Sequence, residues 1–250
     1  MNTIYILWLR QLKRYFRSRA RMIGSLGQPI LFLVALGFGL GPIYTKAGGG
    51  NYIQFLAPGI IGMSILFTAM FSGIGVIWDR QFGFLKETLV APVSRFTIMF
   101  GRTLGGATEA MLQGLVVFII AFAIGFRPVS WLTFPLAFVF MFLIAVLFTA
   151  FGTALASKLE DMQGFQLIMN FVIMPIFFLS GALFPIEGTS TILSTIASLN
   201  PLSYGIDGLR GVFVGAQFSH FGLALDLGVL FFVTLVFLAL GSYLFSKIQI

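Results

Sequence analysis

The sequence of 250 residues contains no cysteine and a single histidine, His220. Disulfide bonds and thiolate metal sites are therefore excluded, and one imidazole is too few for a multi-histidine metal site. We expect His220 to be an ordinary loop residue. Charge is also scarce, since only 9% of the residues are charged and 58% are hydrophobic. A soluble domain of this length carries more charge, so the composition indicates an integral membrane protein.

The apolar residues occur in runs of helical length, unlike the ~10-residue alternating strands of a membrane barrel. A bilayer core of ~30 Å requires about 20 apolar residues per helix, so the chain has room for six spans and short loops. The predicted spans are residues 22–41, 55–77, 103–125, 131–154, 165–184 and 221–245. We therefore expect an all-α integral membrane protein with one transmembrane domain, 1–250. In it an interfacial helix (1–21) precedes a six-span bundle (22–250).

Lysine and arginine are distributed unevenly between the two sides of these spans. Six spans place both termini on one side, and that side receives twelve cations against three on the other, Lys46, Arg127 and Arg210. Because cytoplasmic loops are enriched in lysine and arginine, we expect a multi-pass protein of the cytoplasmic (inner) membrane with both termini in the cytoplasm. The same bias accounts for the net charge of +7 without a nucleic acid partner.

The first 21 residues have the pattern of an amphipathic helix. Projected at 100° per residue, one face comprises Ile4, Tyr5, Trp8, Leu12, Tyr15 and Phe16. The opposite face comprises Arg10, Lys13, Arg14, Arg17 and Arg21, although Ile6 and Leu7 interrupt the pattern. Anionic headgroups attract such cations, so we expect the helix to lie on membrane lipid at the inner leaflet. The alternative is a basic flank that only orients the first span.

Glycine and proline predict where helices end or bend. The stretch LGFGLGP (36–42) is expected to end the first span, and Pro175 is expected to kink the fifth, because proline removes a backbone hydrogen bond. In the half-apolar loop 185–220, Asn200 followed by Pro201 is typical of an N-cap with proline at the first helical position. We expect one or two short external helices that dip into the outer leaflet. Asp207 and Arg210, three residues apart, could pair on one helical face.

The sequence contains no catalytic constellation. There is no G-x-x-x-x-G-K-[ST] phosphate loop, no H-E-x-x-H, no G-x-S-x-G and no cluster of carboxylates. We therefore expect that this chain is not itself an enzyme and holds no cofactor of its own.

Ionisable residues inside a span are expensive, at roughly 2.5–3.5 kcal/mol each near the membrane centre. Glu109 is the only acid well inside a predicted span, and it shares a helical face with Arg102 and Gln113. We expect this face to meet protein or an aqueous cavity rather than lipid. A second, weaker polar stripe enters the fifth span and comprises Gln163, Gln166 and Asn170. Arg102, Glu109, Gln113 and Asn170 are candidates for a translocation path; the alternative is a structural role, a hydrogen-bonded acid and helix–helix contacts.

The loop between spans two and three, WDRQFGFLKETLVAPVSRFTIMFGR (78–102), is neither a membrane span nor a plain polar loop. On a helix, its apolar stripe would comprise Phe82, Leu85 and Leu89, and Lys86, Glu87 and Thr88 would point elsewhere. Pro92 disfavours helix at Ala91, and Ser94 is placed to cap the helix of the third span. Such a segment can lie on lipid or dock into a groove of a soluble partner, and its mixed charge favours the partner.

Three stretches resemble the ABC-2 family of ABC-transporter permeases. They are FLAPGI (55–60), LKETLVAPVSR (85–95) and MPIFFLSGALFPIE…LNPLSYGIDGLRG (174–187 and 199–211). The resemblance covers nearly the whole chain in the right order, with the expected six spans. Within the family, the likeness is closest to daunorubicin-resistance and multidrug-type permeases.

The resemblance implies a half-transporter whose ATPase is a separate polypeptide, so that ATP and Mg are bound by the partner. Two copies of the permease would pair with two ATPase subunits. The family's coupling helix maps onto the loop between spans two and three, here Phe82, Phe84, Leu85, Lys86, Glu87, Thr88, Leu89, Pro92, Ser94 and Arg95. A second candidate ATPase contact is the loop 156–164, with Lys158, Glu160 and Asp161. The family's N-terminal interfacial helix borders the ATPase and matches residues 4–20, with Trp8, Arg10, Lys13, Arg14 and Arg17.

The resulting expectation is the membrane subunit of an ATP-driven exporter of a hydrophobic or amphiphilic substrate, drug-like or lipid-like. One alternative is export of a polysaccharide or glycolipid by the same architecture. Another is a secondary transporter or channel without an ATPase, which predicts several paired intramembrane charges. A third is a membrane-anchored assembly factor.

Overall fold

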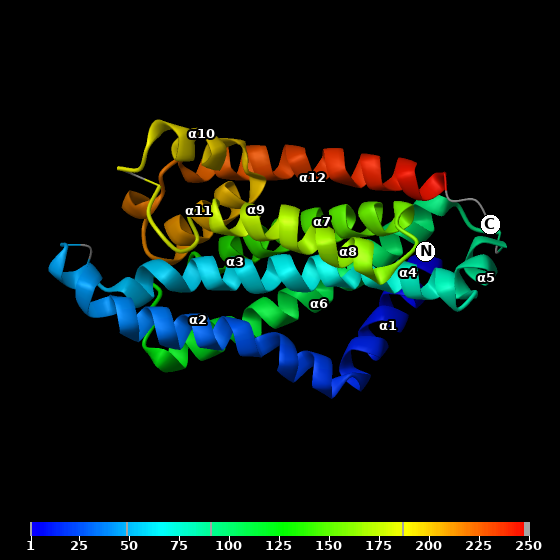
Figure 1. Ribbon diagram of the computed structural model, residues 1–250, viewed down its shortest axis with the longest axis horizontal. Coiled ribbons are helices and arrows are strands. Elements are labelled where there is room, and N and C mark those ends of the chain that lie inside the picture. The colour runs from blue at the N-terminus through cyan, green and yellow to red at the C-terminus, as the bar shows by residue number, and fades with distance from the viewer. Residues whose placement is uncertain (1, 49, 91, 187, 248–250) are drawn as a thin grey trace.

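Helices make up most of the computed structural model, which describes residues 2–48, 50–90, 92–186 and 188–247 (Figure 1). Within these ranges five helical segments are long and apolar enough to cross a bilayer. They are α2 (Arg19–Lys46), α3 with its continuation α4 (Tyr52–Ser72 and Ile74–Gln81), α6 (Arg95–Ile124), α7 (Phe134–Lys158) and α12 (Leu223–Ser246). The shorter apolar segment Met162–Phe178 is the predicted fifth span. The all-α, multi-span class is therefore confirmed.

The long helices run lengthwise through an elongated bundle (Figure 1). α3, α6 and α7 pack against one another in its centre, while α12 lies outside them against α7 and α6, and α2 lies outside against α3. The helix α1 (Asn2–Arg17), α4, the short helix α5 (Phe84–Val90) and the end of α12 gather at one end. The end of α2 and the helices α10 (Thr191–Leu199) and α11 (Pro201–Phe213) lie at the other. The cation-rich segments therefore share the α5 end, as the predicted topology requires.

Two predicted helix starts are confirmed by their capping hydrogen bonds. The Ser94 hydroxyl accepts from the backbone N–H of Thr97 at 3.1 Å at the start of α6. The Asn200 side chain accepts from the N–H of Leu202 at 3.0 Å at the start of α11, where Pro201 is the first helical residue. These caps satisfy donors that have no partner within the helix.

The two predicted short helices between spans five and six are present, but they differ in their surroundings. On α10, Ile192 and Leu199 are exposed. By contrast, α11 is almost wholly buried against α3, α7 and α12. The helix α11 is therefore part of the packed bundle, and the expectation that the two helices dip into the outer leaflet stays a prediction.

Two expectations about helix irregularities have different outcomes. The first span does not end in LGFGLGP, because α2 continues through Pro42 to Lys46. Continuing the helix keeps backbone groups hydrogen-bonded where no water is present. The fifth span is irregular as predicted: α8 (Met162–Ile168) passes into a π-helical turn (Met169–Ile173), and Pro175 stands at the start of α9 (Met174–Phe178).

The predicted pairing of Asp207 with Arg210 is wrong. The Asp207 carboxylate accepts from the Ser219 hydroxyl and from the backbone N–H of His220, both at 2.8 Å. Arg210 donates to the carbonyl of Gly181 at 2.8 Å and lies over the Phe55 ring. Because α11 is buried, each side chain meets a different neighbouring segment. His220 lies in the loop before α12, as expected.

Candidate docking surface and polar cavity

The predicted docking segment folds as a turn followed by a short helix. α4 ends at Gln81, Gly83 adopts a φ of +80°, and α5 starts at Phe84. Leu85 is buried, whereas Phe82 and Val90 are 72% and 76% exposed. The predicted stripe is therefore wrong at Phe82, because the turn at Gly83 places this residue outside α5 and away from Leu85.

The other described residues of this segment lie in α5, in the turn after it or at the start of α6. Phe84, Glu87 and Pro92 are exposed, and the Thr88 hydroxyl donates to the Phe84 carbonyl at 3.0 Å within α5. The side chains of Lys86 and Leu89, and residue Ala91, lie outside the described part of the chain. Arg95 is the first residue of α6. What remains is an exposed apolar patch with one carboxylate at an end of the bundle.

The second predicted contact loop is joined directly to this segment. Arg80 donates from Nη1 to the Leu159 carbonyl at 3.0 Å and from Nη2 to the Ser157 carbonyl at 2.7 Å. Gln81 donates from Nε2 to the Glu160 carbonyl at 3.3 Å. Two loops that are far apart in sequence therefore form one surface.

We define the docking surface by its exposed side chains. They are Phe82, Phe84, Glu87, Val90 and Pro92 of the first loop, and Lys158, Glu160 and Asp161 of the second. Asp161 also caps α8 by accepting from the N–H of Gly164 at 2.6 Å. The roles of Arg80 and Gln81 could not be predicted from the sequence, because their partners are backbone carbonyls, which every residue carries.

Behind the docking surface, Asp79 joins three helices. It is 6% exposed in α4, and its carboxylate binds Arg102 of α6 and, at 3.3 Å, Arg10 of α1. Asp79 precedes Arg80 in the chain, so the ion pairs and the contacts between the two loops lie next to one another. The role of Asp79 could not be predicted from the sequence, because its pairing with Arg102 depends on the turn through α5.

The helix α1 packs along the half of α6 nearer the docking surface, rather than lying on lipid alone. The Trp8 indole N–H donates to the Thr108 hydroxyl at 3.0 Å, and the Tyr15 hydroxyl donates to the Gln113 side-chain carbonyl at 2.7 Å. Burial, followed by the Glu109 carboxylate, raises the pKa of Tyr15 to about 12. The hydroxyl is therefore a proton donor throughout the physiological pH range.

The predicted apolar face of α1 is only partly correct. Tyr5 and Phe16 are exposed at 58% and 55%, while Leu7, assigned to neither face, packs against α6. On the charged side, Lys13 and Arg17 are exposed as expected. Arg10 reaches Asp79, and Arg14 is half-buried with its guanidinium beside Gly75 of α4. Burial lowers the pKa of Arg14, and the nearby Glu109 and Asp79 carboxylates oppose this shift.

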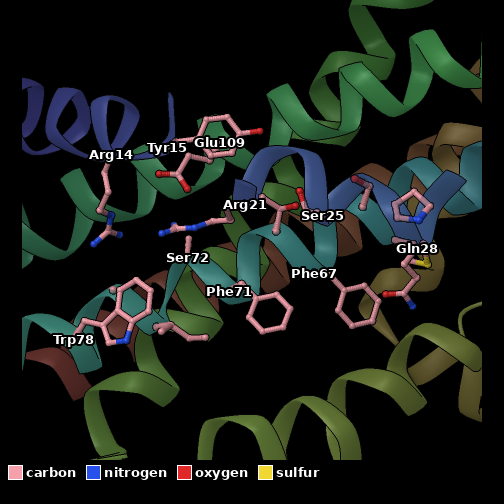
Figure 2. Close-up of a pocket in the computed structure, with 17 residues that line it drawn as sticks. Arg14, Tyr15, Arg21, Ser25, Gln28, Phe67, Phe71, Ser72, Trp78 and Glu109 are labelled. Atoms are coloured by element: carbon pink, nitrogen blue, oxygen red, sulfur yellow. The ribbon is translucent and has the colours of Figure 1, made fainter. Parts of the chain in front are cut away.

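The predicted polar face of α6 is buried but does not form a single site. Arg102, Glu109 and Gln113 are all at most 8% exposed, so this face meets protein, as expected. Arg102 binds Asp79 and Gln113 binds Tyr15, whereas Glu109 lines a cavity of about 410 Å³ (Figure 2). This cavity lies between the α1–α2 junction on one side and α3, α4 and α6 on the other.

The polar stripe of the fifth span lies apart from that cavity. Gln163, Gln166 and Asn170 are exposed, and Gln166 donates to the Asn170 side-chain carbonyl at 3.3 Å. Because these side chains are exposed in the single chain, their expected role in helix–helix contacts stays a prediction. The role of Asn170 in a translocation path stays a prediction.

The described residues form five long apolar helices and a shorter irregular one, with an exposed loop surface at one end. This architecture is that of a multi-span membrane protein. The chain belongs to the ABC-2 type transporter family, whose model matches residues 2–214. It is 30% identical over 213 residues to Nodulation protein J of Rhizobium leguminosarum bv. trifolii, covering 84% of this chain and 78% of that protein. It is 28% identical over 258 aligned residues to the protein named "Putative transport permease ycf38" of Cyanophora paradoxa, covering 99% of this chain and 89% of that protein.

The family expected from the sequence is therefore confirmed, and the chain is a transport permease of this type. The narrower likeness to daunorubicin-resistance and multidrug-type permeases stays a prediction.

Proposed function

We propose that this chain is the transmembrane permease subunit of an ATP-driven ABC exporter. In this proposal a separate ATPase, which binds ATP and Mg, docks on the surface formed by the two joined loops. The permease pairs with a second copy of itself, and two ATPase subunits complete the transporter. The bundle lies in the cytoplasmic membrane with both termini and the docking surface in the cytoplasm.

The observation that carries this proposal is the architecture of the docking surface. Phe82, Phe84 and Val90 are exposed apolar side chains beyond the last turn of α4, with Glu87 beside them. Apolar anchors next to one charge suit a protein groove better than bulk water. The hydrogen bonds from Arg80 to the second loop hold the two loops together, so a partner that displaces one loop would also displace the other.

Ion pairs next to this surface connect it to helices of the bundle. Asp79 stands directly before the docking segment and is bound to Arg102 of α6 and Arg10 of α1. A displacement of α5 would therefore reach α4, α6 and α1 together. On this basis we propose that ATP-dependent closure of the partner moves these helices and switches access to an export path. The mixed polar and aromatic lining of the nearby cavity supports a hydrophobic or amphiphilic substrate.

The docking assignment is tested by a binding measurement. ABC-type ATPases of the source organism are expressed singly with the tagged chain, and complexes are isolated in detergent. The double change Phe84→Asp with Val90→Asp should weaken binding of the cognate ATPase about tenfold or more, because two carboxylates would enter an apolar contact.

A matched control is Leu132→Asp, since Leu132 is 92% exposed in the loop that joins α6 to α7, at the opposite end of the bundle. It should leave ATPase binding unchanged. If no ATPase co-purifies with the unaltered chain, or if both changes weaken binding equally, the proposed docking surface is wrong.

A further inference from the structure

The cavity beside Glu109 has a polar end and an apolar wall. Figure 2 shows Arg14, Arg21 and Glu109 together at one end, with Phe71 and Phe67 following one another along α3. Its volume of about 410 Å³ lies within the roughly 300–1,000 Å³ of small-molecule sites. The cavity shares no residue with the docking surface.

The charges at the polar end do not cancel. Glu109 is 2% exposed and attracts the half-buried Arg14, so these two charges offset one another. Arg21 is in neither of the ion pairs found among the described residues, and its guanidinium lies over the Trp78 ring at 5.6 Å from the ring centre. The cavity therefore carries a net positive charge at Arg21.

The residues that line the cavity also include polar groups without a hydrogen-bond partner. Within the described part of the chain, the Nε of Arg14, the hydroxyl of Ser64 and one carboxylate oxygen of Glu109 are buried without a partner. All three residues line the cavity. A buried polar atom without a partner is costly, so the polar groups of these lining residues are not fully satisfied by the protein itself.

The opposite wall suits a hydrocarbon chain. Phe67 and Phe71 are one helical turn apart on α3, and Met63 continues the same face. Phe71 is 42% exposed, so this wall opens toward the surface of the bundle rather than ending in its core. A ligand with a charged head and an apolar tail matches both parts of the cavity.

We propose that this cavity binds an amphiphile with an anionic headgroup. The headgroup meets Arg21 and Arg14, and the chain lies along Phe67 and Phe71. Guanidinium groups bind phosphate and carboxylate oxygens through paired hydrogen bonds, and a cationic headgroup would be repelled by Arg21. The site is separate from the docking surface, so the proposal stands whether or not an ATPase docks there.

Trp78 lies in the cavity and provides a local fluorescence probe. The changes Trp8→Phe and Trp131→Phe leave it as the only tryptophan of the chain. The purified chain is placed in phosphatidylcholine nanodiscs that contain increasing fractions of brominated phosphatidylglycerol or brominated phosphatidylcholine. We expect half-maximal quenching of Trp78 at a fraction of brominated phosphatidylglycerol about fivefold lower than that of brominated phosphatidylcholine. One arginine contact favours an anionic lipid by a factor of this size.

The matched pair Arg21→Gln and Arg19→Gln separates the site from general surface charge. Both changes remove one cation at the start of α2, but Arg19 is exposed and does not line the cavity. Arg21→Gln should abolish the preference for phosphatidylglycerol, Arg21→Lys should keep part of it, and Arg19→Gln should leave it intact.

A second arm separates the two possible sources of the ligand. The dibromostearate anion is added from solution to pure phosphatidylcholine nanodiscs. If dibromostearate quenches Trp78 and the quenching depends on Arg21, the ligand is an amphiphile that can be taken up from solution, like a transported substrate. If only brominated phosphatidylglycerol quenches Trp78, the ligand is a resident membrane lipid.

Equal quenching by the two brominated lipids, or equal losses in Arg21→Gln and Arg19→Gln, would overturn the proposal. If the single-tryptophan chain does not fold, native mass spectrometry of the chain with all three tryptophans replaces it. Retained phosphatidylglycerol should then exceed phosphatidylcholine and fall with Arg21→Gln, and equal retention counts against the site.

Discussion

At the scale of single residues, Asp79 forms the ion pairs that connect α4 to α6 and α1. It is buried, and it neutralises Arg102, which is only 8% exposed, while its contact with Arg10 involves a side chain that is 46% exposed. Asp79→Asn would leave Arg102 charged, buried and unpaired. We expect a loss of stability of about 3–5 kcal/mol, visible as a lower thermal denaturation midpoint in detergent micelles.

Three companion variants test the cause of this loss. Arg10→Gln should cost at most about 1 kcal/mol, because the Arg10 side chain is 46% exposed and Asp79 keeps its buried partner Arg102. Asp79→Asn combined with Arg102→Gln should recover much of the stability, since no unpaired charge remains. The exposed Glu160→Gln should change it by less than about 0.5 kcal/mol. A double variant as unstable as Asp79→Asn alone would show that the ion pair is not the source.

At the scale of helices, the sequence predicts the spans and two helix caps, but it does not predict the long-range contacts or the continuation of α2 past Pro42. The spans follow from runs of about 20 apolar residues, and the caps at Ser94 and Asn200 from side chains next to the donors they bind. The docked face of α1 did not follow from its sequence, because a helical projection reports hydrophobicity and not which neighbour is close. That neighbour is set by Gly101 and Gly105 of α6, which let α1 approach its backbone.

The docking of α1 can be tested because the chain has no native cysteine. A Cβ at Gly101 would lie 3.1 Å from the Cβ of Leu7, somewhat less than the about 3.5–4.5 Å of a disulfide, so a small separation of the helices would allow the bond. Leu7→Cys combined with Gly101→Cys should therefore cross-link when membranes are oxidised, as measured by proteolysis between the two positions and gel shift. A helix lying free on lipid would give no cross-link.

A third substitution, at Gly105, tests whether the cross-linking yield depends on close packing of α1 against α6. A Cβ there would lie 2.6 Å from the Cβ of Gln11, so Gly105→Leu should push α1 from α6 and lower the cross-linking yield several-fold. Gly39→Leu in α2 is the control, because a Cβ at Gly39 meets no atom within 4 Å. Equal yields in both backgrounds would contradict close packing of α1 on α6.

At the scale of the whole molecule, the two ends of the bundle differ in charge and in structure. The end with α1, α4 and α5 carries most of the lysine and arginine, and the other end carries the exposed α10 and the buried α11 (Figure 1). Because lysine and arginine hold loops on the cytoplasmic side, we expect the α5 end to face the cytoplasm. This orientation also brings the docking surface to the side where ATP is available.

The orientation is tested by labelling single cysteines placed at exposed positions of each end. Lys46→Cys lies at the end of α2, and Glu87→Cys lies in α5. A membrane-impermeant maleimide applied to intact cells should label Lys46→Cys and should label Glu87→Cys only after the membrane is permeabilised. Labelling of both positions without permeabilisation would place the two ends on one side and contradict a bundle that spans the membrane. The reversed pattern would keep the fold but invert its orientation, and the docking surface would then lie on the side without ATP.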